Sequence, residues 1–313
     1  LVAGPIERAT HLLPQLERPR SFNRQQAVDG CRQILWGLFK KMVVADNAAR
    51  LLNPIFENHE HYQASTLVYA AVLFAFQIYG DFSGYSDIAL GSARLLGIEL
   101  LQNFSFPYFS RDIAEFWRRW HISLSSWFRD YVYIPLGGNR GGKWMAVRNT
   151  AVIFVVSGFW HGANWTFLAW GALHAALFMP LLLAGRNRRN TGVVAEGRWL
   201  PTLREAAGIG LTFTMVTLAW VFFRAESIEQ AVSYIGRMFS PGLLSVPKDF
   251  SRFIAAMIAL LLLVEWAGRG NRHALERLGL AWPRWARWLL YYGIIFLILR
   301  YAGRTQEFIY FQF

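Results

Sequence analysis

The feature that most constrains this chain is a long stretch without charge. No Asp, Glu, Lys or Arg occurs between Arg148 and Arg186. Such a stretch is long enough for about two bilayer crossings of about 20 residues each. Near its middle, in "SGFWHGANWTFLAW", His161 lies among aromatic residues and glycine. An ionisable group at membrane depth is costly, so His161 has either a specific packing role or a chemical one.

The composition agrees with a membrane protein. The chain is 54% hydrophobic and 17% charged, whereas soluble domains have about 45–50% apolar and about 25% charged residues. We therefore predict an all-α polytopic membrane protein rather than a large soluble α domain. The net charge of +12 comes from Arg and Lys that fall mainly between apolar runs, as in cytoplasmic loops. This pattern predicts contact with membrane lipid and no nucleic-acid partner. Cys31 is the sole cysteine, which excludes an intrachain disulfide.

Several segments have the low charge expected of membrane spans, and most are short for a hydrocarbon core of about 30 Å. They are residues 64–80, 149–160, 165–185, 206–223, 253–264 and 288–299. Basic loops lie before residue 149, between 185 and 206, and between 264 and 288. If these loops are cytoplasmic, successive spans cross the membrane in opposite directions without contradiction. The turn at 160–165 and the closing "EFIYFQF" then lie on the outer side. The segment 224–252 also carries basic residues, which weakens this assignment, and residues 1–63 receive no orientation.

Residues 104–136 have a different pattern, because aromatic and charged side chains alternate throughout. Phe109, Ile113 and Trp120 recur at near-helical spacing, with arginines among them. This is typical of helices that lie in the membrane interface or re-enter it. The glycines of "PLGGNRGG" should end this helical region. We find no internal repeat and expect one domain over residues 1–313.

Two further histidines deserve comparison with His161. His121 occurs in "FWRRWHISLS", again among aromatic residues, so the two histidines are compatible with one shared site. A structural role for His121, in the interface beside arginines, stays equally open. For His174 we favour packing or a hydrogen bond to a neighbouring helix. Gly158 and Gly162 permit close approach of a backbone or substrate to His161, and Asn164 is a candidate to orient its ring. No helical zinc spacing is present, and we expect no metal.

The stretch "QIYGDFSGYSDIALGSARLLG" places two acids after an uncharged segment. Its glycines and serines suit either tight helix packing or a discontinuous helix around a polar cavity. Asp81 is a candidate partner for an arginine of region 111–129, and Asp87 is best explained by a structural ion pair.

A neutral imidazole is the usual group for taking a proton from a hydroxyl near pH 7. A buried site also excludes the water that would hydrolyse an activated acyl donor. A histidine in an apolar, aromatic setting therefore favours acyl transfer as the chemistry.

The same residues carry a resemblance to a known family. "WRRWHISLSSWFRDYVYIPLGGNRGG" and "SGFWHGANWTFLAWGALHA" resemble the membrane-bound O-acyltransferases. "LVAGPIERATHLLPQL", the "YGDFSGYSDIALGSARLLG" region and "EFIYFQF" are similar to the branch that holds the membrane subunit of alginate O-acetylation, a relative of teichoic-acid D-alanyl transfer proteins. The resemblance covers essentially the whole chain. Family members begin with further spans, so the chain is expected to lack an N-terminal part.

The resemblance implies a fold and a set of roles. The fold is a ring of tilted transmembrane and in-plane helices around a central funnel. The catalytic histidine of the family matches His161, and its second motif histidine matches His121. We expect His161 to act as general base or to stabilise the acyl group, while His121 orients or protonates. The residues expected along the substrate tunnel are Trp117, Trp120, Trp160, Asn164 and Asp81.

The resemblance also implies the reaction. An acetyl or other acyl group would pass from a cytoplasmic thioester, either acetyl-CoA or an acyl carrier, to hydroxyls of an exported polysaccharide such as alginate. Extracytoplasmic acetyltransferases or other polysaccharide-modifying proteins are the expected partners, the bacterial inner membrane is the expected location, and no bound cofactor is expected. The alternatives are D-alanyl or other acyl transfer to a cell-wall polymer, and a non-enzymatic polysaccharide or lipid transporter subunit. A transporter often shows inverted repeats, which this sequence lacks.

Overall fold

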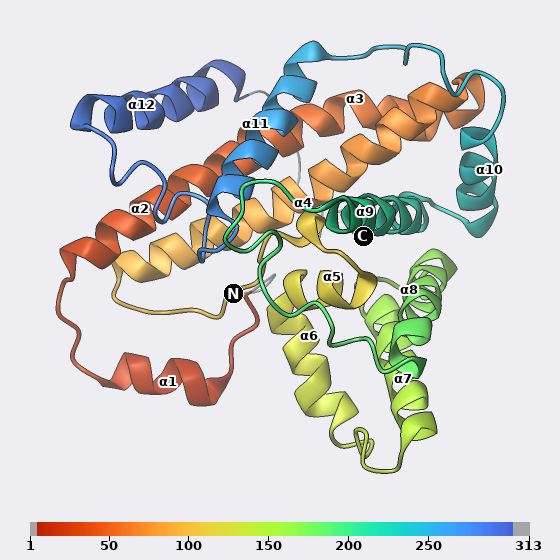
Figure 1. Ribbon diagram of the computed structural model, residues 1–313, viewed down its shortest axis with the longest axis horizontal. Coiled ribbons are helices and arrows are strands. Elements are labelled where there is room, and N and C mark those ends of the chain that lie inside the picture. Colours follow the sequence, from red (N-terminus) through yellow and green to blue (C-terminus); the bar gives the residue numbers. More distant parts are fainter. Residues whose placement is uncertain (1–4, 303–313) are drawn as a thin grey trace. The chain divides into compact units, whose positions relative to one another are not determined.

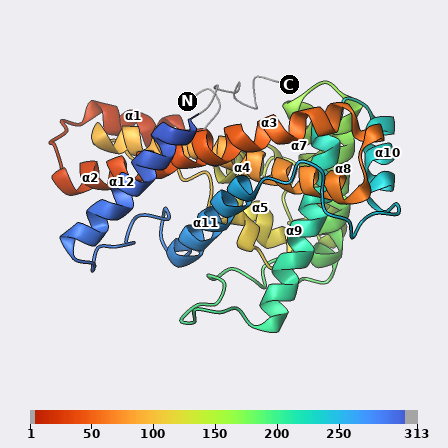
Figure 2. The same cartoon turned by 90° about the horizontal axis from the view of Figure 1, so that it is seen from above.

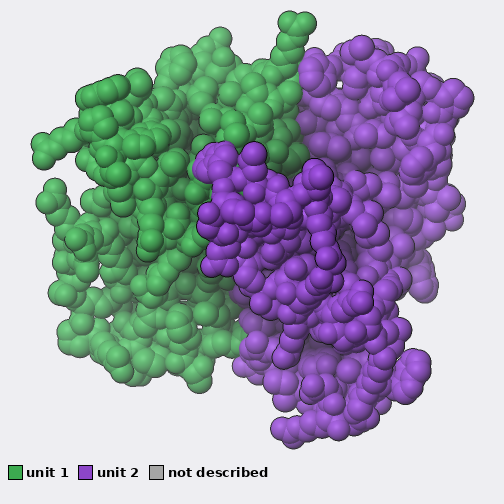
Figure 3. Space-filling view, in the orientation of Figure 1, with its two compact units in different colours: residues 1–50, 76–106, 251–312 green, residues 51–75, 107–250, 313 purple. Residues whose placement is uncertain are grey.

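The described part of the chain is helical. The computed structural model describes residues 5–302, and within that range every regular element is a helix and no strand occurs. The described residues form two compact units, coloured separately in Figure 3. Unit 1 contains residues 5–50, 76–106 and 251–302, and unit 2 contains residues 51–75 and 107–250. The predicted helical class is therefore confirmed, whereas the orientation of "EFIYFQF" falls outside the described residues.

Unit 1 is made of long helices from both ends of the chain (Figure 1). Its elements are α1 (Ala9–Glu17), α2 (Arg24–Leu38), a π-helix (Phe39–Ala45), the start of α3 (Asp46–Glu57), residues 76–95 of α4 (Ala64–Leu95), α11 (Arg252–Gly268) and α12 (Arg284–Tyr301). The π-helix continues α2 directly into α3, so residues 24–57 form one helical run. This run was not predicted from the sequence.

Unit 2 contains the candidate site histidines His121, His161 and His174. Besides the remainder of α3 and of α4, it contains two 3₁₀ turns (His59–His61 and Pro107–Phe109), α5 (Ile113–Arg119), α6 (Ile122–Phe128), a π-helix (Arg129–Tyr133), α7 (Lys143–His161), α8 (Trp165–Leu183), α9 (Leu203–Arg224) and α10 (Ile228–Met238). Helices α7 and α8 run side by side in both views (Figures 1 and 2). Gly137, Gly138 and Gly142 have positive φ and form the turns before α7, so "PLGGNRGG" ends the helical region as predicted.

Each predicted span coincides with a helix, namely α4, α7, α8, α9, α11 or α12. Three of these, α4, α8 and α9, are long and apolar enough to cross a membrane. Helix α4 continues to Leu95, well past the predicted end at residue 80. The expectation of a discontinuous helix around Asp81 is therefore wrong, and the alternative of tight packing is correct.

Glycines explain the tight packing of α2 against α4. Gly30 of α2 faces Gly91 of α4, and Gly37 of α2 faces Gly84 of α4. On each helix the two glycines are seven residues apart. A Cβ on Gly37 would lie 2.7 Å from the carbonyl oxygen of Gly84. Small residues on matching faces allow two helix backbones to approach closely, so these four positions fix the crossing of the two helices.

The acids of α4, of which Asp81 is buried and Asp87 partly buried, pair with lysines of the π-helix of unit 1. Lys40 contacts Asp87 at 2.6 Å, and Lys41 contacts Asp81 at 2.7 Å. Asp87 also accepts a 2.8 Å hydrogen bond from Gln33. The structural ion pair predicted for Asp87 is confirmed. Asp81 contacts Lys41 of its own unit, and its pairing with an arginine of region 111–129, which belongs to unit 2, stays a prediction.

Removing Lys40 should show how much this pairing matters. Lys40→Met leaves the partly buried Asp87 carboxylate without its cation, and breaking a buried ion pair typically costs about 3–5 kcal/mol. We expect a large fall in the thermal unfolding temperature of the detergent-solubilised protein. The double variant Lys40→Met/Asp87→Leu should recover most of that loss, and a double variant no more stable than Lys40→Met would contradict this account.

Candidate functional site

His161 lies at the C-terminal end of α7, among aromatic rings from two neighbouring helices. Its ring centroid is 5.0 Å from that of Trp160, 5.3 Å from that of Trp170 on α8 and 5.2 Å from that of Phe223 on α9. The short connection of residues 162–164 leads from α7 straight into α8. The three helices therefore place apolar rings around the imidazole, whose side chain is partly exposed.

His121 meets the same cluster from a different segment. It separates α5 from α6 and adopts a left-handed backbone conformation, with φ 45° and ψ 53°. Only 2% of its surface is exposed, and its ring centroid lies 6.3 Å from that of Trp160. Trp160 thus contacts both His121 and His161, so the structure brings the two predicted histidines together. Burial, with a smaller contribution from His161, lowers the pKa of His121 well below its ordinary value, so its imidazole is neutral at pH 7.

The left-handed conformation of His121 carries a cost. Residues other than glycine rarely adopt it, although His, Asn and Asp do so more often than most. Such strain persists where the surroundings hold the residue in place, and it concentrates at functional sites. Here it turns the chain sharply between two short helices and points a buried imidazole at the aromatic cluster.

His174 packs and hydrogen-bonds to a neighbouring helix, as the sequence predicted. It is fully buried on α8, and its Nδ1 accepts a 3.3 Å hydrogen bond from the indole N–H of Trp117. Because Nδ1 accepts, the proton of the neutral ring lies on Nε2, which has no hydrogen-bond partner among the described residues. The indole nitrogens of Trp170 and Trp220 are likewise buried without a partner there. Three N–H donors in one aromatic cluster thus have no acceptor within residues 5–302.

The predicted tunnel residues have different surroundings. Trp117 lies between His174 and Phe154, and Trp120 is buried with its ring centroid 5.1 Å from that of Trp220. Trp160 is about half exposed and contacts both site histidines. These three tryptophans all belong to the cluster around the histidines or border it.

Asn164 and Asp81 do not have the expected surroundings. The Asn164 side chain accepts from the backbone N–H of Thr166 at 3.2 Å and donates to the carbonyl oxygen of Glu226 at 3.0 Å. It therefore caps α8, and the expectation that it orients the His161 ring is wrong. Asp81 belongs to unit 1, where Lys41 contacts it.

A cavity of about 380 Å³ leads toward the cluster within unit 2. Its walls include Trp117 of α5, Phe154 and Ser157 of α7, and Phe178 of α8, and Asn187 lines it beyond the end of α8. Ser157 precedes His161 by four residues, so the two side chains lie one turn apart on one helix face. The cavity thus connects the loop after α8 with the neighbourhood of His161.

The packing of α7 on α8 holds these parts in register. A Cβ on Gly158 would collide with the carbonyl oxygen of Phe167, and one on Gly171 would collide with that of Phe154. Gly158 therefore serves the approach of a backbone rather than of a substrate. At Gly162 the nearest neighbour is the ring of Phe167. Among the described residues, no group of three or more His, Cys, Asp or Glu side chains is placed to hold a metal ion.

The helices and the histidines among aromatic rings define a helical membrane protein with an imidazole site. The family model of the membrane-bound O-acyltransferases matches residues 1–207, and the chain belongs to this family.

The similar curated proteins include two alginate O-acetylases and a peptidoglycan O-acetyltransferase. The chain is 38% identical over 242 residues to the probable alginate O-acetylase AlgI of Azotobacter vinelandii and 40% identical over 242 residues to that of Pseudomonas aeruginosa. Both alignments cover 77% of this chain, and they cover 46% and 44% of the relatives. The peptidoglycan O-acetyltransferase of Helicobacter pylori is 32% identical over 337 residues, covering 100% of this chain and 62% of that protein. The chain thus spans about half the length of the alginate relatives.

Proposed function

We propose that the full-length protein is a membrane-embedded O-acyltransferase that moves an acetyl or other acyl group from a cytoplasmic thioester toward hydroxyls of an exported polysaccharide. The observation that carries this proposal is the shared aromatic cluster of His161 and His121, with a cavity that reaches Ser157 one turn from His161. Family membership supports the reaction class. The donor is acetyl-CoA or an acyl-carrier thioester.

The proposed chemistry uses His161 as general base. Its imidazole takes the proton of an acceptor hydroxyl while the hydroxyl oxygen attacks the carbonyl carbon of the thioester. The carbon–sulfur bond then breaks, and the protonated imidazole returns its proton to the departing sulfur. Negative charge develops on the carbonyl oxygen in between, and correctly placed N–H donors stabilise such charge. The donors without acceptors on His174, Trp170 and Trp220 are suited to this task.

The role of His121 is to position His161 through the aromatic cluster. His121→Asn tests this role, because asparagine tolerates the left-handed conformation and lacks the imidazole. We expect kcat for acyl transfer to fall about 100-fold, with the donor KM within about twofold of the wild-type value and an unchanged unfolding temperature. A variant with wild-type kcat, or one whose pH profile shifts without loss of the maximum rate, would contradict a positioning role.

The acceptor proposed first is alginate or a similar exopolysaccharide, because the alginate O-acetylases have the higher identity. A second candidate is peptidoglycan, because the Helicobacter pylori enzyme aligns with the whole chain. D-alanyl transfer to a cell-wall polymer and a transporter role complete the alternatives. Mass spectrometry of polymers from strains with and without the full-length protein separates them: acetyl on exopolysaccharide supports the first, acetyl on glycan strands the second, and D-alanyl ester the third. Polymer export that changes without any change in acylation would favour the transporter.

The remaining parts of the proposal concern the membrane location, the arrangement of the helices and the partner proteins. We propose a multi-pass protein of the bacterial inner membrane, with its helices arranged around a central funnel where donor and acceptor meet. Extracytoplasmic acetyltransferases or other polysaccharide-modifying proteins would receive the acyl group. The length and apolar character of α4, α8 and α9 support the membrane location.

A further inference from the structure

A cavity in unit 1 has a polar lining with charges of both signs. It measures about 250 Å³ and is lined by residues of α1, α2, the end of α4, the segment 99–102 and the loop after α11 (Figure 1). Its polar lining residues are His11, Gln33, Arg94, Glu99, Gln102 and Arg272. Because they come from separate stretches of sequence, the tertiary structure and no single motif creates this cavity.

Hydrogen bonds from side chains to backbone hold the walls of the unit 1 cavity. Gln15 of α1 accepts from the backbone N–H of Glu99 at 2.8 Å and donates to its carbonyl oxygen at 2.9 Å. Gln102 donates to the carbonyl oxygen of Arg272 at 3.0 Å. The segment 99–102 is thereby tied to α1 on one side and to the loop after α11 on the other, so the fold fixes the shape of the cavity.

One buried acceptor in this lining has no partner. Gln33 is 2% exposed, and its side-chain nitrogen donates to Asp87 at 2.8 Å. Since a carboxylate can only accept, this hydrogen bond fixes the orientation of the amide. The side-chain oxygen of Gln33 has no hydrogen-bond partner among residues 5–302. Leaving a buried acceptor unpaired is costly, so the cavity is suited to a ligand that brings a donor to this oxygen.

The charged residues of the lining offer one site for an anion and one for a cation. The side chains of Arg272 and Glu99 are more than half exposed, and their nearest atoms are 3.9 Å apart, which is longer than a hydrogen bond. Both therefore keep their hydrogen-bonding capacity for a ligand. Arg94 adds a second guanidinium, whose charge is balanced by Asp29 at 2.7 Å.

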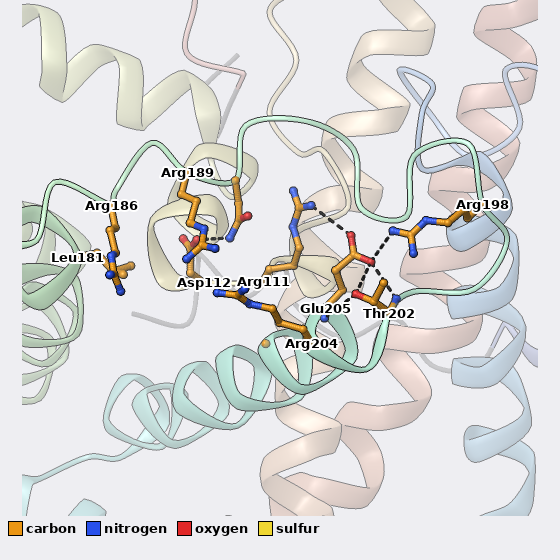
Figure 4. Close-up of a pocket in the computed structure, with 11 residues that line it drawn as sticks. Arg111, Asp112, Leu181, Arg186, Arg189, Arg198, Thr202, Arg204 and Glu205 are labelled. Carbon is orange, nitrogen blue, oxygen red and sulfur yellow. Dashed lines mark hydrogen bonds and ion pairs between the residues drawn. The ribbon is translucent and has the colours of Figure 1, made fainter.

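This balance of charge points to a zwitterion. In the cavity of unit 2 that Figure 4 shows, five arginines and two acids form the lining. In the unit 1 cavity each of the two arginines has an acid beside it. A ligand with both a phosphate and an ammonium group matches such a lining better than a plain anion does, because each of its charges meets a group of opposite sign.

Apolar side chains are exposed on the same elements. Leu13 and Leu16 are exposed on α1, which carries His11, and Leu95 and Leu96 are exposed directly after Arg94. Exposed leucines on a short helix at a membrane surface suit contact with acyl chains. Pockets that enclose a whole small ligand usually measure about 300–1,000 Å³. A cavity of about 250 Å³ therefore suits the polar end of a larger amphiphile.

We propose that the unit 1 cavity binds the headgroup of phosphatidylethanolamine. Arg272 and Arg94 bind the phosphate, because guanidinium groups match phosphate oxygens. The ammonium group, which has three donors, binds Glu99 and the unpaired side-chain oxygen of Gln33. The loop of Arg272 is predicted to be cytoplasmic, so the lipid comes from the cytoplasmic leaflet. This site is separate from the proposed acyl transfer and does not depend on it.

Three phospholipids with identical acyl chains test the assignment. Phosphatidylcholine has the same charges without N–H donors, and phosphatidylglycerol has the phosphate without the ammonium group. Delipidated full-length protein in detergent would be titrated with each lipid and analysed by native mass spectrometry. The test variants are Glu99→Gln and Arg272→Gln. The control is Glu17→Gln/Arg277→Gln, which removes one charge of each sign at exposed positions outside the cavity.

We expect the wild type to bind phosphatidylethanolamine about 10-fold more tightly than the other two lipids, the usual effect of one hydrogen bond to a charged group. Glu99→Gln should lose the preference for phosphatidylethanolamine over phosphatidylcholine. Arg272→Gln should weaken the binding of all three lipids about 10-fold, because all three carry the phosphate. The control should bind like the wild type. Equal affinity of the wild type for the three lipids, or unchanged binding by both test variants, would overturn the proposal.

A water-soluble phosphoethanolamine compound is the other source of this headgroup. Calorimetric titration of the wild type with glycerophosphoethanolamine separates the two sources, because this compound lacks the acyl chains. We expect it to bind at least about 10-fold more weakly than the lipid, since burial of apolar chains contributes to binding of the lipid alone. Binding as tight as that of the lipid would assign the cavity to a soluble ligand and overturn the lipid assignment.

Discussion

Replacing His161 with glutamine is expected to reduce acylation of the exported polymer by a factor of about 10² to 10⁴, the usual contribution of a general base. Glutamine is similar in size and polar, but it cannot take a proton from a hydroxyl at neutral pH. Since His161 lies among Trp160, Trp170 and Phe223, glutamine should keep the packing of α7 against its neighbours. The measurement is the ester-linked acetyl content of the polymer in a strain whose only copy is the full-length variant.

A matched control removes a histidine elsewhere. His61 is exposed in a 3₁₀ turn, so His61→Gln should leave the acetyl content unchanged. Both variants must reach the wild-type abundance in the membrane. Normal acetylation by His161→Gln at equal abundance would remove His161 from the chemistry.

The second large effect is expected from Gly158→Ala, which should lower the stability of the protein. The added methyl group meets the backbone carbonyl of Phe167, which cannot move without separating α7 from α8. Overpacking of this kind costs about 3 kcal/mol. We expect a clearly lower unfolding temperature in detergent and loss of acyl transfer, because His161 ends the same helix.

Gly236→Ala is the matched control for Gly158→Ala. Gly236 lies in α10, and a Cβ there meets nothing within 4 Å. Alanine should therefore stabilise the protein by about 0.5–1 kcal/mol through its higher helix propensity. A Gly158→Ala protein as stable as the wild type would show that the backbones of α7 and α8 do not meet as described.

Charge-free length was a good guide to helices and a poor guide to their ends. It located α8 and α9 within a few residues, because apolar segments in a membrane protein satisfy their backbone groups internally, but it missed residues 143–148 of α7. It ended the first segment at residue 80, while α4 continues past Asp81 and Asp87. Those acids pair with Lys41 and Lys40, which come from a segment some forty residues earlier in the chain. Such pairing depends on tertiary structure, and no local pattern reveals it.

The candidate site was predictable only in part, because local sequence surroundings reveal some of its contacts and tertiary structure decides the rest. The aromatic surroundings of His121 and His161 indicated one cluster, and Trp160 indeed contacts both. The hydrogen bond predicted between His174 and a neighbouring helix is confirmed, since Trp117 of α5 donates it. For Asn164 a local rule was available, since its position directly before α8 is that of an N-cap. The expectation of one domain and the assigned chemical roles stay predictions.

The most direct test of the central claim uses purified full-length protein in proteoliposomes. Acetyl-CoA labelled in the acetyl group would be supplied on the side of the basic loops, with deacetylated alginate and the expected partner proteins on the other side. The account predicts that label reaches the polymer as an ester with the wild type, and that His161→Gln transfers none above background. Equal transfer by His161→Gln and wild type, at equal reconstituted amounts, would contradict it.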